Sequence, residues 1–74
     1  MNEKQYRARI MNNDNTCTDL LIPMMLLDDF KLVNFGIRYL IDFTYNLLED
    51  ADRERAWKMV FYYEGKMLGS GFCQ

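Results

Sequence analysis

The sequence predicts an α+β fold in which one long helix lies across one face of a small antiparallel β-sheet of three to four strands, in the order β-β-α-β-β. Three observations support this fold class. Residues 5–11 alternate between polar and apolar side chains, residues 29–50 are apolar at helical spacing, and residues 57–73 contain two further strand-like stretches around a Glu-Gly turn. We treat residues 1–74 as a single domain, because a chain of 74 residues has room for one modest core.

The first predicted strand is followed by a turn and an ambiguous segment. One face of the strand carries Tyr6, Ala8 and Ile10. Residues 12–15 favour a turn, since Asn and Asp side chains bond to nearby backbone and tolerate positive φ. Residues 16–25 are predicted to pair back as a second strand, with Pro23 at a sheet edge or strand end. The alternative is a short helix that starts at Thr16 and is interrupted by Pro23.

The clearest element is a helix from about Asp29 to Asp50, with Asp28 or Asp29 as its N-cap. The face expected to pack on the sheet is centred on Val33, Ile37, Leu40, Thr44, Leu47 and Leu48. Gly36 costs a helix about 1 kcal/mol relative to alanine, which we interpret as a sign of close approach by another backbone. Residues 50–53 are expected to form a polar turn.

A C-terminal hairpin follows, with its turn at Glu64-Gly65, where glycine supplies a positive φ. A two-residue loop pairs Phe61 with Leu68, Met59 with Ser70, Trp57 with Phe72, Tyr62 with Met67 and Val60 with Gly69. The hairpin face expected in the core against the helix therefore consists of Trp57, Met59, Phe61, Leu68 and Phe72. Gly69 and Gly71 weaken the last strand and indicate a bulge or a close backbone contact.

Composition argues against catalysis and metal binding. The chain has no histidine, so it has no Ser-His or Cys-His nucleophile pair and no imidazole ligand. Two cysteines cannot complete a tetrahedral zinc site. We interpret the paired carboxylates Asp28-Asp29, and Asp42 with Glu49, as capping and solvated groups. We therefore expect no enzymatic activity, no cofactor and no bound metal.

The cysteines and the apolar runs bear on the cellular compartment. Cys17 and Cys73 are expected to be reduced thiols; the alternative is a disulfide that joins the C-terminus to the 14–18 turn. We see no basic-then-apolar leader and expect a reducing, cytoplasmic location, in the host cell if the protein is viral. The longest apolar run, residues 20–27, is far shorter than the roughly 20 residues that cross a bilayer, so no membrane is expected as a partner.

One flank of the predicted helix favours protein binding. The helix is apolar over about 240° of its circumference, whereas a helix on one sheet needs a stripe somewhat over 100° wide. The surplus forms a ridge at three- and four-residue spacing: Leu32, Phe35, Tyr39 and Phe43. This ridge requires a cover, either another protein, a second copy in a homodimer, or residues 20–27 of the same chain.

The first strand offers a second candidate surface. Lys4, Arg7 and Arg9 form a basic group available for nucleic-acid contact, and Tyr62 on another strand is a candidate stacking platform. A net charge of −2 argues against this interpretation, because nucleic-acid-binding domains usually carry a basic footprint. The structural alternative is a strand that its arginines keep soluble.

The sequence thus predicts a non-enzymatic protein-binding module that acts stoichiometrically on a larger macromolecular partner. Small chains of this kind suit an inhibitor, an anti-defence protein or an adaptor of a virus or mobile element, a step that rests on analogy between small proteins. The alternatives are a small nucleic-acid-associated regulator that uses Lys4, Arg7 and Arg9, and a structural subunit of a multiprotein assembly.

Overall fold

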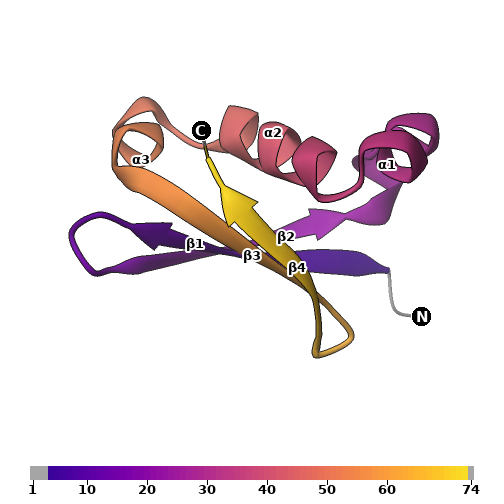
Figure 1. Ribbon diagram of the computed structural model, residues 1–74, viewed down its shortest axis with the longest axis horizontal. Coiled ribbons are helices and arrows are strands. Elements are labelled where there is room, and N and C mark those ends of the chain that lie inside the picture. The colour runs from indigo at the N-terminus through magenta and orange to yellow at the C-terminus, as the bar shows by residue number, and fades with distance from the viewer. Residues whose placement is uncertain (1–3, 74) are drawn as a thin grey trace.

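The computed structural model describes residues 4–73, which form an antiparallel sheet with helices on one face (Figure 1). The sheet has four strands in the spatial order β2-β1-β3-β4. Their bounds are β1 (Gln5–Asn12), β2 (Cys17–Pro23), β3 (Ala56–Tyr63) and β4 (Lys66–Phe72). A 3₁₀ turn, η1 (Met24–Leu26), and three helices, α1 (Asp29–Phe35), α2 (Ile37–Leu47) and α3 (Asp50–Arg55), connect β2 to β3. The predicted α+β class and the β-β-α-β-β order are confirmed, but the single long helix is wrong.

The first hairpin forms as predicted. Tyr6, Ala8 and Ile10 are buried under the helices, and β1 lies centrally because it pairs with both β2 and β3. The turn uses its Asn residues as expected: Asn15 has a φ of 68°, and its N–H donates to the Asn12 carbonyl over 3.1 Å. Residues 17–23 are a strand that ends at Pro23 on the sheet edge, so the short-helix alternative is wrong.

Gly36 divides the predicted long helix into α1 and α2. Its φ of 56° and ψ of −128° lie in a region that side-chain-bearing residues rarely occupy. A Cβ atom placed on Gly36 would meet no other atom within 4 Å, so our explanation by close approach of another backbone is wrong. Asp28 caps α1 as expected, since its carboxylate accepts the Lys31 N–H. Glycine is needed at position 36 for its backbone conformation.

The break changes which apolar residues reach the sheet. In α2, Leu40, Ile41 and Thr44 are buried, with Leu48 just beyond it. In α1 no residue is buried, and Val33, placed by periodicity at the centre of the packing face, is 83% exposed. Leu47 is half exposed. The predicted packing face is therefore wrong for Val33 and Leu47. It is correct for the other four residues: Ile37, Leu40, Thr44 and Leu48.

Residues 50–55 form α3 where a polar turn was expected. Asp50 and Asp52 lie in its first turn and Arg53 and Arg55 in its last, which matches each charge to the helix dipole. Arg53 pairs with Asp50, and Arg55 pairs with Asp52, each at i,i+3 spacing. These local pairs account for a short helix in a segment with no apolar face.

The C-terminal hairpin has the predicted turn but a different register. Glu64 and Gly65 both have positive φ, and Tyr62 pairs with Met67 as expected. Beyond that pair, Phe61 faces Gly69 and Met59 faces Gly71, because Leu68 is an extra residue in β4. The two glycines thus lie under α2, where a Cβ on Gly71 would stand 2.7 Å from Ile41 Cδ1. Of the two predicted explanations for these glycines, the bulge is confirmed, and the close contact comes from the side chains of Ile37 and Ile41.

A second bulge moves Trp57 out of the core. Met11 pairs with Lys58 and Asn12 with Ala56, which leaves Trp57 as the extra residue in β3. The Trp57 ring stacks on Phe72 at a centroid distance of 5.8 Å, and Phe72 pairs with Lys58 away from the helices. Met59 and Phe61 are fully buried as predicted, whereas Trp57, Leu68 and Phe72 are exposed and their assignment to the core is wrong.

The thiols are free, and the disulfide alternative is wrong. Cys17 starts β2 at one edge of the sheet, while Cys73 follows β4 at the other edge. Burial raises the pKa of the Cys73 thiol, although the nearby Arg38 charge acts in the opposite direction. Within residues 4–73 no helix combines the length and the apolar character needed to cross a bilayer.

The two bulges predict unequal roles for the large aromatic residues of β3. Phe61→Ala should lower the free energy of unfolding by about 3–5 kcal/mol, since it empties a fully buried site. Trp57→Ala should cost about 1–2 kcal/mol, because the half-exposed ring loses mainly its stacking on Phe72. Urea unfolding followed by circular dichroism measures both values. Equal losses for the two variants would place Trp57 back in the core.

Gly36→Ala distinguishes the broken helix from a continuous one by the sign of its effect. The positive φ at Gly36 predicts that alanine lowers the free energy of unfolding by about 1–3 kcal/mol. A continuous helix would instead gain about 1 kcal/mol from the same change. Val33→Ala is the matched control in α1 and should change stability by about 0.5 kcal/mol or less, because Val33 faces solvent.

Candidate functional site

A groove runs along the surface of α1 and α2. Its volume is about 580 Å³, and it is lined by Lys31, Phe35, Arg38, Tyr39, Asp42, Phe43 and Asn46. Three aromatic residues at four-residue spacing form its apolar lining, and charged and amide side chains alternate with them. The predicted aromatic ridge therefore lies along this groove, with one exception described below.

The aromatic lining is held in place by contacts with the rest of the fold. The Asp28 N–H donates to the Tyr39 hydroxyl oxygen over 2.8 Å, which fixes the ring across the start of α1. The Tyr39 and Phe43 rings pack at a centroid distance of 6.0 Å and an interplanar angle of 58°. Both residues are half-buried against the core, whereas Phe35 is 59% exposed. Phe35 is thus the ring with most surface still available to a partner.

The charged rim of the groove is mixed in sign. Arg38 Nε lies 4.0 Å from an Asp42 carboxylate oxygen one helical turn away, and an Arg38 N–H donates to the Phe72 carbonyl over 2.9 Å. Arg38 therefore links the groove to the edge strand β4. Lys31 lies at the α1 end of the groove and Asn46 at the α2 end.

Leu32 and residues 20–27 behave differently from our expectation. Leu32 packs against the core beside the helix break and does not line the groove. Residues 20–27 were the intramolecular candidate for covering the ridge, but Ile22 and Leu27 point into the core. Among the described residues, none from this segment lines the groove, so residues 20–27 contribute to the core beneath the ridge and leave the groove open.

An apolar end of the molecule was not predicted from the sequence. Here α1 and the preceding 3₁₀ turn expose a set of large side chains: Met25, Leu26, Phe30 and Val33. The sequence signal was the three-residue spacing of Phe30 and Val33, but a continuous helix would have placed Val33 against the sheet. Phe30 and Val33 lie on a different side of α1 from Phe35, so this apolar end is separate from the groove.

The predicted basic residues lie at and beside the outer face of the sheet, which we define as the face away from the helices. No helix of residues 4–73 covers this face (Figure 1). Arg7 places its guanidinium 5.1 Å from the centre of the Tyr62 ring. Arg9 Nε lies 3.2 Å from Asp19, whose hydrogen bond and charge raise the pKa of Arg9. Lys4 is exposed just before β1.

Trp57 and Phe72 join the outer face through the two bulges, whereas Lys58 lies there by regular alternation with Val60 and Tyr62. Trp57 and Phe72 form the stacked pair, with an interplanar angle of 27°, and Lys58 Nζ lies 5.9 Å from the centre of the Phe72 ring. Sequence reasoning assigned both aromatic residues to the core, so it missed them. The two glycines of β4 were the available signal, since they mark the positions that face α2.

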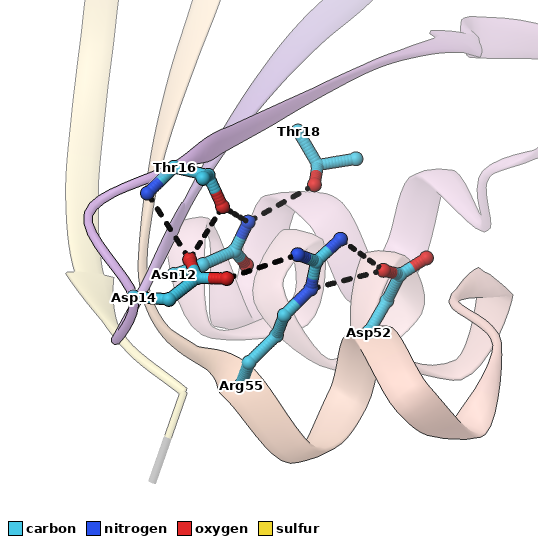
Figure 2. Close-up of polar contacts among 6 residues, drawn as sticks. All are labelled: Asn12, Asp14, Thr16, Thr18, Asp52 and Arg55. Carbon is cyan, nitrogen blue, oxygen red and sulfur yellow. Dashed lines mark hydrogen bonds and ion pairs between the residues drawn. The ribbon is translucent and has the colours of Figure 1, made fainter.

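A polar network connects the first hairpin turn to α3 (Figure 2). The Arg55 guanidinium bridges Asp14, at 3.2 Å, and Asp52, at 2.7 Å. Thr16 donates to Asp14 from both its hydroxyl and its backbone N–H. Asn12 in turn donates from its side chain to the Thr16 and Thr18 hydroxyl oxygens. These bonds hold α3 against the turn, which is a structural role.

The described residues contain no group of three or more His, Cys, Asp or Glu side chains placed to hold a metal ion. Absence of a metal and of enzymatic activity stays a prediction from composition. Comparisons with protein-family models, with curated proteins and with solved structures found no significant match to this chain. Its function must therefore be inferred from its own surfaces.

The network around Asp14 predicts a measurable titration. Hydrogen bonds from Thr16, with a smaller contribution from Arg55, lower the pKa of Asp14 below its ordinary value of 3.8. Because the pKa is lower in the folded than in the unfolded state, ionised Asp14 stabilises the fold above the unfolded value. That contribution is lost as the pH falls through the folded value. Carboxyl chemical shifts should report a midpoint below the ordinary one.

Variants separate the two causes of the Asp14 shift. Thr16→Val removes the hydroxyl donor and should raise the Asp14 pKa more than Arg55→Gln does, since Thr16 is the larger cause. Circular dichroism at each pH identifies general unfolding. A wild-type Asp14 that titrates at or above its ordinary value would contradict the network.

Proposed function

We propose that this chain is a non-enzymatic protein-binding module that acts stoichiometrically on a larger macromolecular partner. The observation that carries the proposal is the groove along α1 and α2, lined by Phe35, Tyr39 and Phe43. The partner is a protein segment that presents apolar side chains to this groove. An inhibitor or anti-defence role, or an adaptor role, in a virus or mobile element is the biological setting we propose for such binding.

Unused apolar surface supports this function. No residue of α1 is fully buried, and three of its large apolar side chains are exposed: Phe30, Val33 and Phe35. These apolar side chains are in contact with water in the free chain. Burying them would stabilise a complex by roughly 25 cal/mol per Å² of apolar area. A partner on the groove supplies that burial for Phe35. Aromatic residues are also frequent among those that dominate binding energy at protein interfaces.

The rim suits recognition of an apolar segment that carries mixed charges. Lys31 and Arg38 can pair with carboxylates of the partner, whereas Asp42 can accept from a cation or an amide. A second copy of the chain would satisfy the same chemistry in a homodimer, and the experiment below distinguishes the two occupants by oligomeric state. A structural subunit of an assembly would use the same surface.

Phe35→Asp tests the groove. The chain should remain folded, because Phe35 is exposed in the free protein. Binding should weaken by about tenfold or more, because the variant loses an aromatic side chain that the partner buries. Tagged wild type and variant are used to capture partners from nuclease-treated native lysate, with stoichiometry measured by quantitative mass spectrometry. Circular dichroism checks the fold.

Phe72→Asp is the matched control, since Phe72 is similarly exposed but lies on the outer face of the sheet. It should retain the partner that Phe35→Asp loses. Sedimentation velocity on purified wild type identifies a second copy as the occupant if a dimer forms and Phe35→Asp makes it monomeric. A monomeric wild type that captures nothing through Phe35 would refute the proposal.

A further inference from the structure

We propose that the outer face of the sheet binds single-stranded nucleic acid, with bases stacking on Trp57 and Phe72 and phosphates pairing with Arg7 and Lys58. This site is separate from the α1–α2 groove and does not depend on the function proposed for it. Of the three basic residues predicted from the sequence, Arg7 is the one whose guanidinium lies over an aromatic ring of this face. Lys4 lies beside the face, and Arg9 is partly neutralised by Asp19.

Charge is unevenly divided between the two layers of the molecule. On the strand positions of the outer face the ionisable residues are Arg7, Arg9, Lys58 and Asp19, an excess of two positive charges. Residues 24–55, which form the helical layer, carry seven carboxylates and four cations, an excess of three negative charges. The net charge of −2 therefore conceals a cationic surface on the strands, although Glu54 of α3 lines a hollow beside Trp57 and Phe72. A polyanion is attracted to that face and repelled by the other.

The aromatic rings of this face have the exposure and the geometry for stacking. Trp57 is 46% exposed and Phe72 is 57% exposed, although each covers part of the other. Lys58 stands beside the Phe72 ring, and Arg7 stands over the Tyr62 ring on the same face. Flat rings flanked by cations recognise successive bases of a single strand, because every base has a π-face and is joined to a phosphate.

A shallow hollow beside Trp57 adds polar groups for base edges. It has a volume of about 210 Å³ and is lined by Met11, Asn12, Asn15, Thr16, Cys17 and Trp57. The side chain of Asn15 and the backbone of this turn offer donors and acceptors at its exposed end. A base that stacks on the Trp57 ring has this hollow next to it, so the turn becomes a candidate for base preference.

The shape and charge favour a single strand over a duplex. In a duplex the faces of the bases are stacked on one another, and proteins recognise it with elements that enter a groove. Three cations on a broad sheet also neutralise few of its phosphates. For single strands the logarithm of the binding constant falls with the logarithm of salt with a slope of about −0.7 per phosphate contact. Two or three contacts predict a slope between about −1.4 and −2.1, so stacking supplies much of the binding.

Trp57 reports directly on the proposed contact, because it is the single tryptophan of the chain. Twelve-nucleotide oligouridylate, oligothymidylate and a duplex of the same length are titrated into the full chain at about 50 mM salt. Both single strands should quench Trp57 emission and bind with the shallow salt slope given above. The duplex should bind about tenfold more weakly or worse, since its bases cannot stack on the rings.

Variants of equal charge change locate the site. Lys58→Glu on the outer face should weaken single-strand binding by about tenfold, whereas Lys31→Glu in the helical layer should leave it unchanged within about twofold. Likewise Phe72→Asp should weaken binding by about tenfold, and Phe35→Asp should not. These pairs have the same net charge, so a difference within a pair comes from position.

An acidic protein segment is the other occupant that a cationic face admits, and polyglutamate tests it. Polyglutamate supplies the charge but no bases, so it should displace the oligonucleotide poorly and leave Trp57 emission unchanged. Displacement by polyglutamate at equal charge concentration would overturn the proposal. Absence of quenching by either oligonucleotide, or equal losses in Lys58→Glu and Lys31→Glu, would overturn it as well.

Discussion

The positive φ at Gly36 is the constraint on which the rest of the structure depends. This backbone conformation turns the chain between α1 and α2. As a result α2 packs on the sheet, whereas no residue of α1 is fully buried. One continuous helix would have directed Val33 at the sheet. Instead Val33 faces solvent beside other large apolar side chains, and Leu32 packs at the break. One backbone conformation therefore creates both the core contact of α2 and the apolar surface of α1.

The contact between α2 and β4 is the second consequence. Ile37 and Ile41 lie so close to the strand that the positions beneath them carry no side chain, Gly69 and Gly71. The bulge at Leu68 brings these glycines to the inner face and sends Phe72 to the outer face. Close packing on one side of the sheet thus accounts for the exposed aromatic residue on the other side.

Both candidate surfaces follow from the two-layer architecture. A sheet covered by helices on one side leaves the outer face of the sheet and the outer surface of the helices in water. Here each is chemically distinct: the helical layer has an aromatic groove and an acidic excess, and the sheet has stacked rings and a basic excess. The two surfaces lie on opposite layers, so the two proposed partners would not compete for the same site.

The sequence by itself determined the elements whose evidence is local. Alternation in β1, the Asn-rich turn, the Asp28 cap and the Glu64-Gly65 turn each need only neighbouring residues, and all are present. Periodicity likewise placed Phe35, Tyr39 and Phe43 along one helix flank, and strand alternation placed Arg7 and Arg9 on one face of β1. Tertiary structure alone decided which way Trp57, Phe72 and Val33 point. The physical reason is that one bulge residue reverses the side-chain direction of a strand, and one glycine turns a helix. Both choices are made by packing between segments that are distant in the chain.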